Sequence, residues 1–88
     1  MDDHEKYQYC ANKFIRLANE LKDEKIDPAM VSGALMKASC VYATFLAAGN
    51  SGALEPSGVD KVAAIYRRTL EELQEKKKTQ LVNKKFGQ

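Results

Sequence analysis

The side chains that could do chemistry in this chain are two cysteines and one histidine. Cys10 and Cys40 stand far wider apart than the CxxC spacing of metal and redox sites. His4 lies in the acidic amino end, where we expect it to be solvated and mobile. A zinc site therefore lacks its ligands, and a nucleophile assisted by histidine lacks its base. We predict that the chain is not an enzyme and holds no metal and no cofactor.

The carboxylates and the glycine-rich segment have simple explanations. Glu71, Glu72 and Glu75 alternate with basic residues, as on the solvent-exposed side of a helix. The stretch GNSGALEPSG (residues 49–58) lacks the GKS/T ending of a phosphate-binding loop. No small-molecule substrate is indicated. A site that several copies of the chain build together stays an open alternative.

Both cysteines fall on helix faces that are apolar or lined by small residues, so we expect buried thiols that act as small hydrophobes. A disulfide between them is open if the first two helices form an antiparallel hairpin. The compartment argues against it, because the amino end MDDHEKYQY resembles no export signal. We expect a reducing cytoplasm.

The basic residues of the chain gather at one end. Residues 76–88 hold five lysines and no acid, whereas residues 1–75 hold nine basic and twelve acidic residues. Five lysines can neutralise phosphates without reading sequence. The simpler explanation is a solvated helix end, where cations suit the helix dipole. The candidate phosphate contacts are Lys76, Lys77, Lys78, Lys84 and Lys85.

Three helices are expected, over residues 3–24, 28–48 and 58–76. In the first, apolar residues recur at steps of three and four on one face, namely Tyr7, Cys10, Phe14, Leu17 and Leu21. Asp27 suits the cap and Pro28 the first position of the second helix. Gly49 and Asn50 supply a left-handed stop. A capping box at Ser57 and Asp60 opens the third helix.

The second helix is long enough to cross a bilayer, so a membrane span has to be weighed. Lys37 stands near its centre, where a charge costs at least about 2.5 kcal/mol on insertion scales, and many of its residues are small. We therefore predict a protein core. The main core side collects the large residues, and Leu35 and Phe45 are expected to be buried. Its members are Val31, Leu35, Ala38, Tyr42, Phe45 and Leu46.

The opposite side of this helix is nearly all small, which lets another helix approach closely. Either the other helices of the chain cover this side, or a second copy of the protein does. We favour self-association. The residues of this small-residue face are Ser32, Gly33, Met36, Ser39, Cys40, Ala43 and Ala47.

The third helix carries an apolar stripe that is interrupted at Lys77, so packing should end near Leu73 and a mobile Lys-rich tail should follow. These elements predict an all-α fold, a three-helix antiparallel bundle whose second helix is central. Residues 1–75 form one domain in this prediction. Its function is that of a protein-interaction or structural module that binds itself or another protein. The alternative is an accessory protein that contacts nucleic acid through the lysines.

Three segments carry a family resemblance: KFIRLANELKDE, VSGALMKASCVYATFLAA and AAIYRRTLEEL. Together they resemble a domain-of-unknown-function family of small helical proteobacterial proteins. Phe14, Leu17 and Asn19 match its first motif, Val31 and Leu35 its second. Tyr66 and Leu70 match the third. The resemblance spans roughly residues 7–73. It implies a bacterial source and a helical fold and transfers no catalytic residue.

Overall fold

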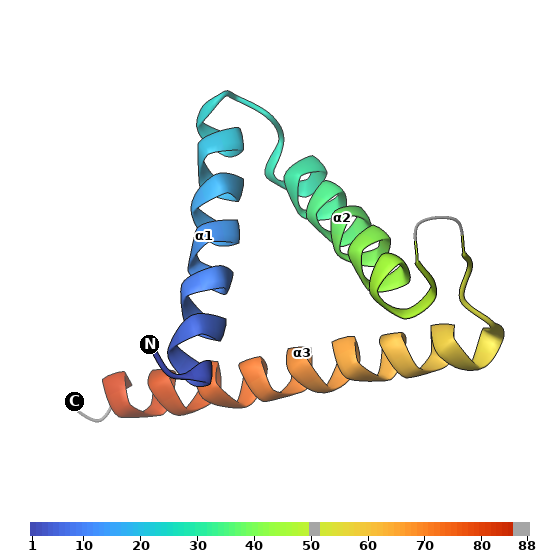
Figure 1. The fold of residues 1–88 in the computed structure, drawn as a ribbon. Coiled ribbons are helices and arrows are strands. Elements are labelled where there is room, and N and C mark those ends of the chain that lie inside the picture. Colours follow the sequence, from blue (N-terminus) through green and yellow to red (C-terminus); the bar gives the residue numbers. More distant parts are fainter. Residues whose placement is uncertain (50–51, 86–88) are drawn as a thin grey trace. The chain divides into compact units, whose positions relative to one another are not determined.

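The computed structural model describes residues 1–49 and 52–85 of the 88-residue chain (Figure 1). It contains the helices α1 (Asp3–Asp23), α2 (Pro28–Ala48) and α3 (Pro56–Lys85). No strand occurs in these two described ranges. The predicted all-α class with three helices is confirmed.

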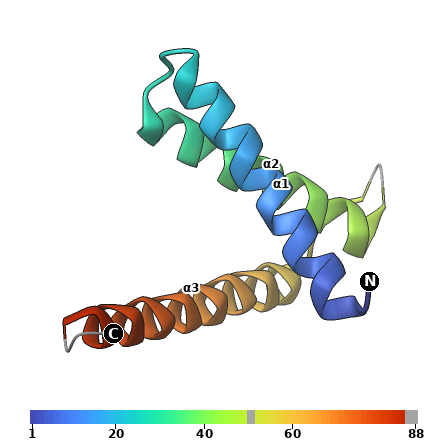
Figure 2. The same ribbon diagram turned by 90° about the vertical axis from the view of Figure 1, so that its left-hand side faces the viewer.

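The chain divides into two compact units, Met1–Ala43 and Thr44–Gln88. The first unit is a hairpin made of α1 and most of α2, joined by a short connection (Figure 2). The second unit holds the end of α2, the following loop and α3. The central place of the second helix within a bundle stays a prediction.

The amino end of α1 is fixed by a reciprocal pair of hydrogen bonds. The Glu5 backbone N–H donates to the Asp2 carboxylate at 2.8 Å, and the Asp2 N–H donates to the Glu5 carboxylate at 3.2 Å. This capping box satisfies two amides that a helix start leaves unpaired. His4 therefore lies in the first turn of a helix, and its expected place in a mobile amino end is corrected.

The connection between α1 and α2 is built by residues with distinct backbone roles. Glu24 caps α1, and Lys25 follows with φ +67°, the left-handed region that usually favours glycine after a helix. The Asp27 carboxylate accepts from the Ala29 N–H at 2.9 Å, and Pro28 takes the first helical position. Both roles were predicted for Asp27 and Pro28 and are confirmed.

The carboxyl end of α2 also follows its prediction. Gly49 has φ +81°, and its N–H donates to the Phe45 carbonyl at 2.8 Å. A residue without a Cβ takes this left-handed geometry at little cost. Asn50, the other half of the predicted stop, lies outside the described residues.

The beginning of α3 differs from the sequence prediction. The helix starts at Pro56, so Ser57 lies inside the first turn and the capping box predicted for Ser57 and Asp60 is wrong. Pro56 stands where Pro28 stands in α2, at the first helical position, where its missing N–H leaves no bond unmade. The Val59 N–H donates to the Glu55 carbonyl at 3.0 Å and closes the first turn.

The end of α3 differs more. The helix continues to Lys85, so the predicted end at residue 76 is corrected by more than two turns. Strong helix formers such as Lys, Gln and Leu fill this stretch, which holds no Gly or Pro. Lys78 also pairs with Glu75 at 3.5 Å, one turn back along the same helix. The backbone therefore stays helical beyond Lys77, although the apolar stripe is interrupted there.

Burial is sparse in the chain. Val31 is 8% exposed and is the single buried residue among those described. Leu35 and Phe45, predicted to be buried, are 42% and 45% exposed. Cys10 and Cys40 are both exposed, so the expected burial of the two thiols is also wrong. Of the predicted core face on α2, Val31 is the one residue that is buried.

Candidate functional site

The residues that could take part in catalysis or metal binding do not form a cluster. His4 and Cys10 lie on α1 and Cys40 lies on α2, each exposed. In the described ranges, no three His, Cys, Asp or Glu side chains are grouped so that they could hold a metal ion. The candidate sites of this chain are therefore its exposed apolar and basic surfaces.

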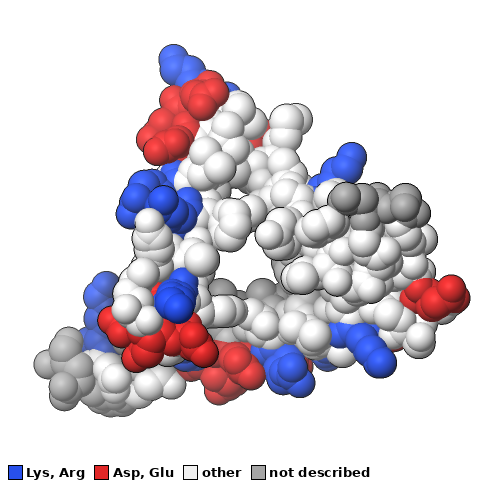
Figure 3. All heavy atoms as spheres, viewed as in Figure 1, with Lys and Arg blue, Asp and Glu red and all other residues white. Residues whose placement is uncertain are grey.

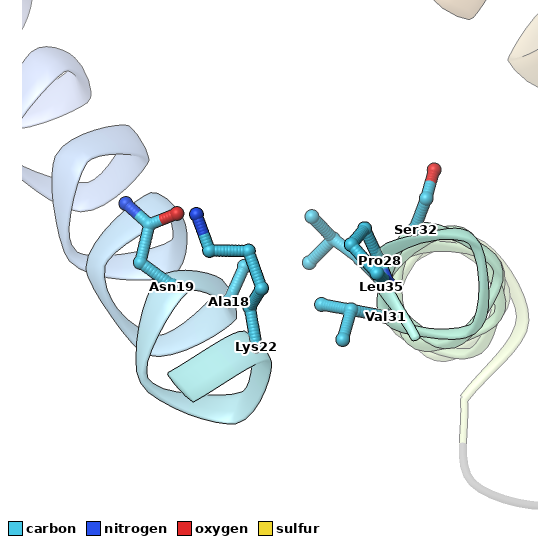
Figure 4. A pocket seen from close by; sticks show the side chains of 7 residues that line it. All are labelled: Ala18, Asn19, Lys22, Pro28, Val31, Ser32 and Leu35. Carbon is cyan, nitrogen blue, oxygen red and sulfur yellow. The ribbon is translucent and has the colours of Figure 1, made fainter. Parts of the chain in front are cut away.

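A small cleft lies where α1 and α2 meet near their connection (Figure 4). Val31 and Leu35 extend from α2 toward α1, while the Ser32 hydroxyl points aside. The cleft measures about 240 Å³, below the roughly 300–1,000 Å³ of small-molecule sites. Its lining was not foreseen as a set from the sequence: Ala18, Asn19, Lys22, Pro28, Val31, Ser32 and Leu35. We interpret it as incomplete packing between two helices.

The small-residue face runs along one side of α2, away from Val31 and Leu35. Ala43 is half-buried, and the other six members are exposed. A Cβ added to Gly33 would meet no atom within 4 Å, so the chain places nothing against this part of the face. Because Pro28–Ala48 is helical, the spacing of these residues places them on one side of α2.

Large apolar side chains on α1 are exposed as well. Tyr7 is 69% exposed, Phe14 60% and Leu17 53%, although the three share the predicted apolar face. Half-buried residues of the first unit include Ala18, Leu21 and Ile26, all near the connection. The hairpin is thus packed at its turn, and the amino half of α1 keeps its apolar face uncovered.

On α3 the apolar residues form a stripe at helical spacing. The group consists of Val59, Val62, Tyr66, Leu70, Leu73 and Leu81. Val62 is half-buried, and the other five are 46–67% exposed. Leu54, in the loop before α3, packs against Gly58 in the first turn of the helix. A Cβ added to Gly58 would lie 3.4 Å from the Leu54 Cδ2 atom. We call these six residues the α3 stripe.

The candidate phosphate-binding lysines lie on α3, whose last residue is Lys85. At 100° per residue, Lys76, Lys77 and Lys78 point in three directions around the helix axis. Lys78 is already paired with Glu75. The structure brings these lysines into one segment. Lys77 and Lys84, seven residues apart, share one side of α3, whereas Lys76 lies about 100° away from Lys77.

Charge is scarce around α2. Lys37 is the single charged residue of this helix, and much of the surface visible in Figure 3 is neither acidic nor basic. With a mean hydropathy of 1.4, α2 is long and apolar enough to cross a membrane by length and composition alone. The core helix of a water-soluble protein meets the same criterion but is mostly buried, whereas 6% of the apolar window of α2 is buried.

Comparisons with known proteins give a family and no activity. Searches of curated proteins and of solved structures each find no match to this chain. A family profile described as a protein of unknown function, DUF3144, matches residues 7–82. The profile covers both units and confirms the resemblance found in the sequence motifs. The chain belongs to the DUF3144 family.

Proposed function

We propose that this protein is a non-catalytic helical module that associates with copies of itself and thereby covers its apolar faces. One observation carries the proposal. Val31 is the single buried residue in the described part of the chain, and most large apolar side chains of both compact units are exposed.

The free energy that burial of the exposed apolar side chains would contribute favours a partner. Full burial of one large apolar side chain contributes roughly 1.5–3 kcal/mol relative to exposure. Tyr7, Phe14 and Leu17 on α1 thus represent several kcal/mol, comparable with the roughly 5–15 kcal/mol by which domains are stable. Because burial of this apolar face would contribute several kcal/mol, its exposure to water favours association.

A second copy is the partner that we favour. The chain offers complementary partners for itself, because apolar faces occur on α1, α2 and α3 alike. The small-residue face of α2 adds a surface that another helix can approach closely, open at Gly33. A membrane is disfavoured as the cover of α2 because Lys37 stands in the middle of the helix. Closure of the faces within one chain is the alternative that an experiment has to separate.

Sedimentation velocity and thermal unfolding over about a hundred-fold range of protein concentration test the proposal. We expect a species larger than the monomer, in buffer without detergent, and a thermal midpoint that rises with concentration. A monomer throughout, with a constant midpoint, would show that the chain covers its own faces and would refute self-association. A protein that needs detergent or vesicles to stay in solution would instead point to a membrane.

Nucleic-acid contact through the lysines is tested in the same preparation. Binding of the full chain and of a chain ending at Glu75 to a generic DNA duplex is compared at physiological salt. We expect little difference, because Lys78 is already paired with Glu75 and a few phosphate contacts give only weak binding at physiological salt. Tight, salt-sensitive binding that is lost with residues 76–88 would reverse this order of the two candidate functions.

A further inference from the structure

The α3 stripe has an unusual period. From Val59 to Leu73 its residues follow at steps of three, four, four and three. The same spacing continued along the helix gives positions 77, 81 and 84, of which 77 and 84 are lysines. This is an 11-residue spacing, 3.67 residues per turn, which drifts only about 20° per repeat on an ideal helix and corresponds to a slight right-handed supercoil of two such helices. The stripe can therefore contact a second helix over most of its length if the two wind slightly around each other.

We propose that α3 packs against α3 of a second copy in antiparallel orientation, centred near Thr69. This inference rests on the proposed self-association and names the surface and the orientation. Val59, Tyr66, Leu70 and Leu73 would be the apolar contacts, since each is about half exposed.

A row of charges beside the stripe supports the antiparallel orientation. Asp60, Arg67, Glu71 and Lys78 fall within about 40° of one another on the helical wheel. Along the chain they read acid, base, acid, base at spacings of seven, four and seven, so the row is symmetrical about position 69. Reversing the helix about this point sets Asp60 opposite Lys78 of the second copy and Arg67 opposite Glu71 of that copy.

The relation of Arg67 to Glu71 is already visible within one chain. The Arg67 Nε atom lies 3.5 Å from a Glu71 carboxylate oxygen, with both side chains largely exposed. The two groups therefore project from the same side of α3 into solvent. A second copy in the reversed orientation would extend this pair into a cluster of four alternating charges across the contact.

The stripe itself disfavours the parallel orientation. Lys77 and Lys84 continue the spacing of the stripe. In a parallel pair in register, each of these lysines would face the same lysine of the second copy, and the like charges would repel. The flanking charges alone would not decide, because a parallel pair would place Arg67 beside Glu72 of the second copy. In the antiparallel pair Lys77 lies instead near Asp60 of the other chain.

A charge-reversal cycle tests the orientation. Asp60→Lys and Lys78→Glu are made singly and together, and the dissociation constant of self-association is measured by sedimentation equilibrium. Each single change should weaken association about tenfold, and the double change should restore it. Residues 60 and 78 lie about 27 Å apart along one helix, so they cannot compensate for each other within one chain.

The outcomes separate the two claims. Restoration by the double variant supports antiparallel packing of α3. Association that is unchanged by the single variants, or weakened without restoration, overturns this orientation and leaves self-association in place. A wild-type monomer would refute the proposed function itself. Circular dichroism of each variant checks that α3 is still helical.

Discussion

The Asp27 carboxylate accepts a hydrogen bond of 2.9 Å from the Ala29 backbone N–H, so one side chain both ends the connection and begins α2. The Asp27 carbonyl accepts from the N–H groups of Met30 and Val31 at 2.9 and 3.1 Å. Pro28 between them supplies no N–H of its own. The start of the most apolar helix of the chain is therefore fixed by a single acidic residue.

Replacing Asp27 by Ala should lower the free energy of unfolding by about 1 kcal/mol, because the cap bond to Ala29 is lost. Asp27→Asn is the matched control and should retain most of the stability, since its side-chain oxygen accepts the same bond. Urea unfolding followed by circular dichroism at one fixed protein concentration measures both. Equal losses for Ala and Asn would assign the effect to charge instead of capping.

Lys25 offers a change in the opposite direction. Its φ of +67° strains a residue with a Cβ, so Lys25→Gly should stabilise the first unit by about 0.5–1 kcal/mol. Lys13→Gly, in the middle of α1, is the control and should destabilise it by about 1 kcal/mol or more. Part of that loss is the contact of the Lys13 ammonium with the Tyr9 ring, 5.1 Å from its centroid. Destabilisation by both glycines would contradict the left-handed geometry at Lys25.

Val31 is the point where the hairpin is packed. Val31→Ala should cost about 2 kcal/mol, the transfer energy of two methyl groups plus the cavity that is left. Val41→Ala removes the same atoms from the same helix at a position that is 62% exposed. We expect it to change the midpoint of urea unfolding by much less. Equal effects would mean that α2 packs through another side.

Local signals in the sequence were enough to place most helix ends. Asp27 with Pro28 and the glycine at position 49 each determine backbone geometry through their own side chain or its absence, so their roles do not depend on distant contacts. The capping box of Asp2 and Glu5 follows the same rule and was readable in the sequence. Pro56 is also a local signal for a helix start, and the prediction of Ser57 as the cap did not use it.

Burial was less predictable, for a physical reason. The wheel shows which residues share a side of α2, but the covering of Leu35 or Phe45 depends on helices that approach from elsewhere. The predicted end of α3 was wrong for a similar reason. Lys77 interrupts the apolar stripe and so affects packing, whereas the helix depends on backbone propensity and continues to Lys85. The small-residue face is visible in the sequence, and its partner is not.

The helical carboxyl end of α3 gives a separate prediction. Truncation after Lys78 should reduce the helical circular dichroism per molecule in proportion to the helical residues 79–85. The thermal midpoint should stay nearly unchanged, because the removed segment adds only Leu81 to the α3 stripe. A helical signal that does not fall would show that this segment is not helical in solution. A midpoint that drops sharply would show that residues 79–88 dock on the protein.

The last prediction concerns Ala43, which is half-buried on the small-residue face of α2. If a second copy approaches this face, Ala43→Leu overpacks the contact and should weaken association by roughly 1–3 kcal/mol. Sedimentation of wild type and variant over the same concentration range measures the change in the dissociation constant. Gly33→Ala is a milder companion, because the chain itself leaves space for the added Cβ and alanine favours the helix by about 1 kcal/mol. A loss of association in the glycine variant would therefore come from a second molecule, since nothing in the same chain resists the added methyl group. Unchanged association in both variants would exclude this face and leave α3 as the surface on which copies meet.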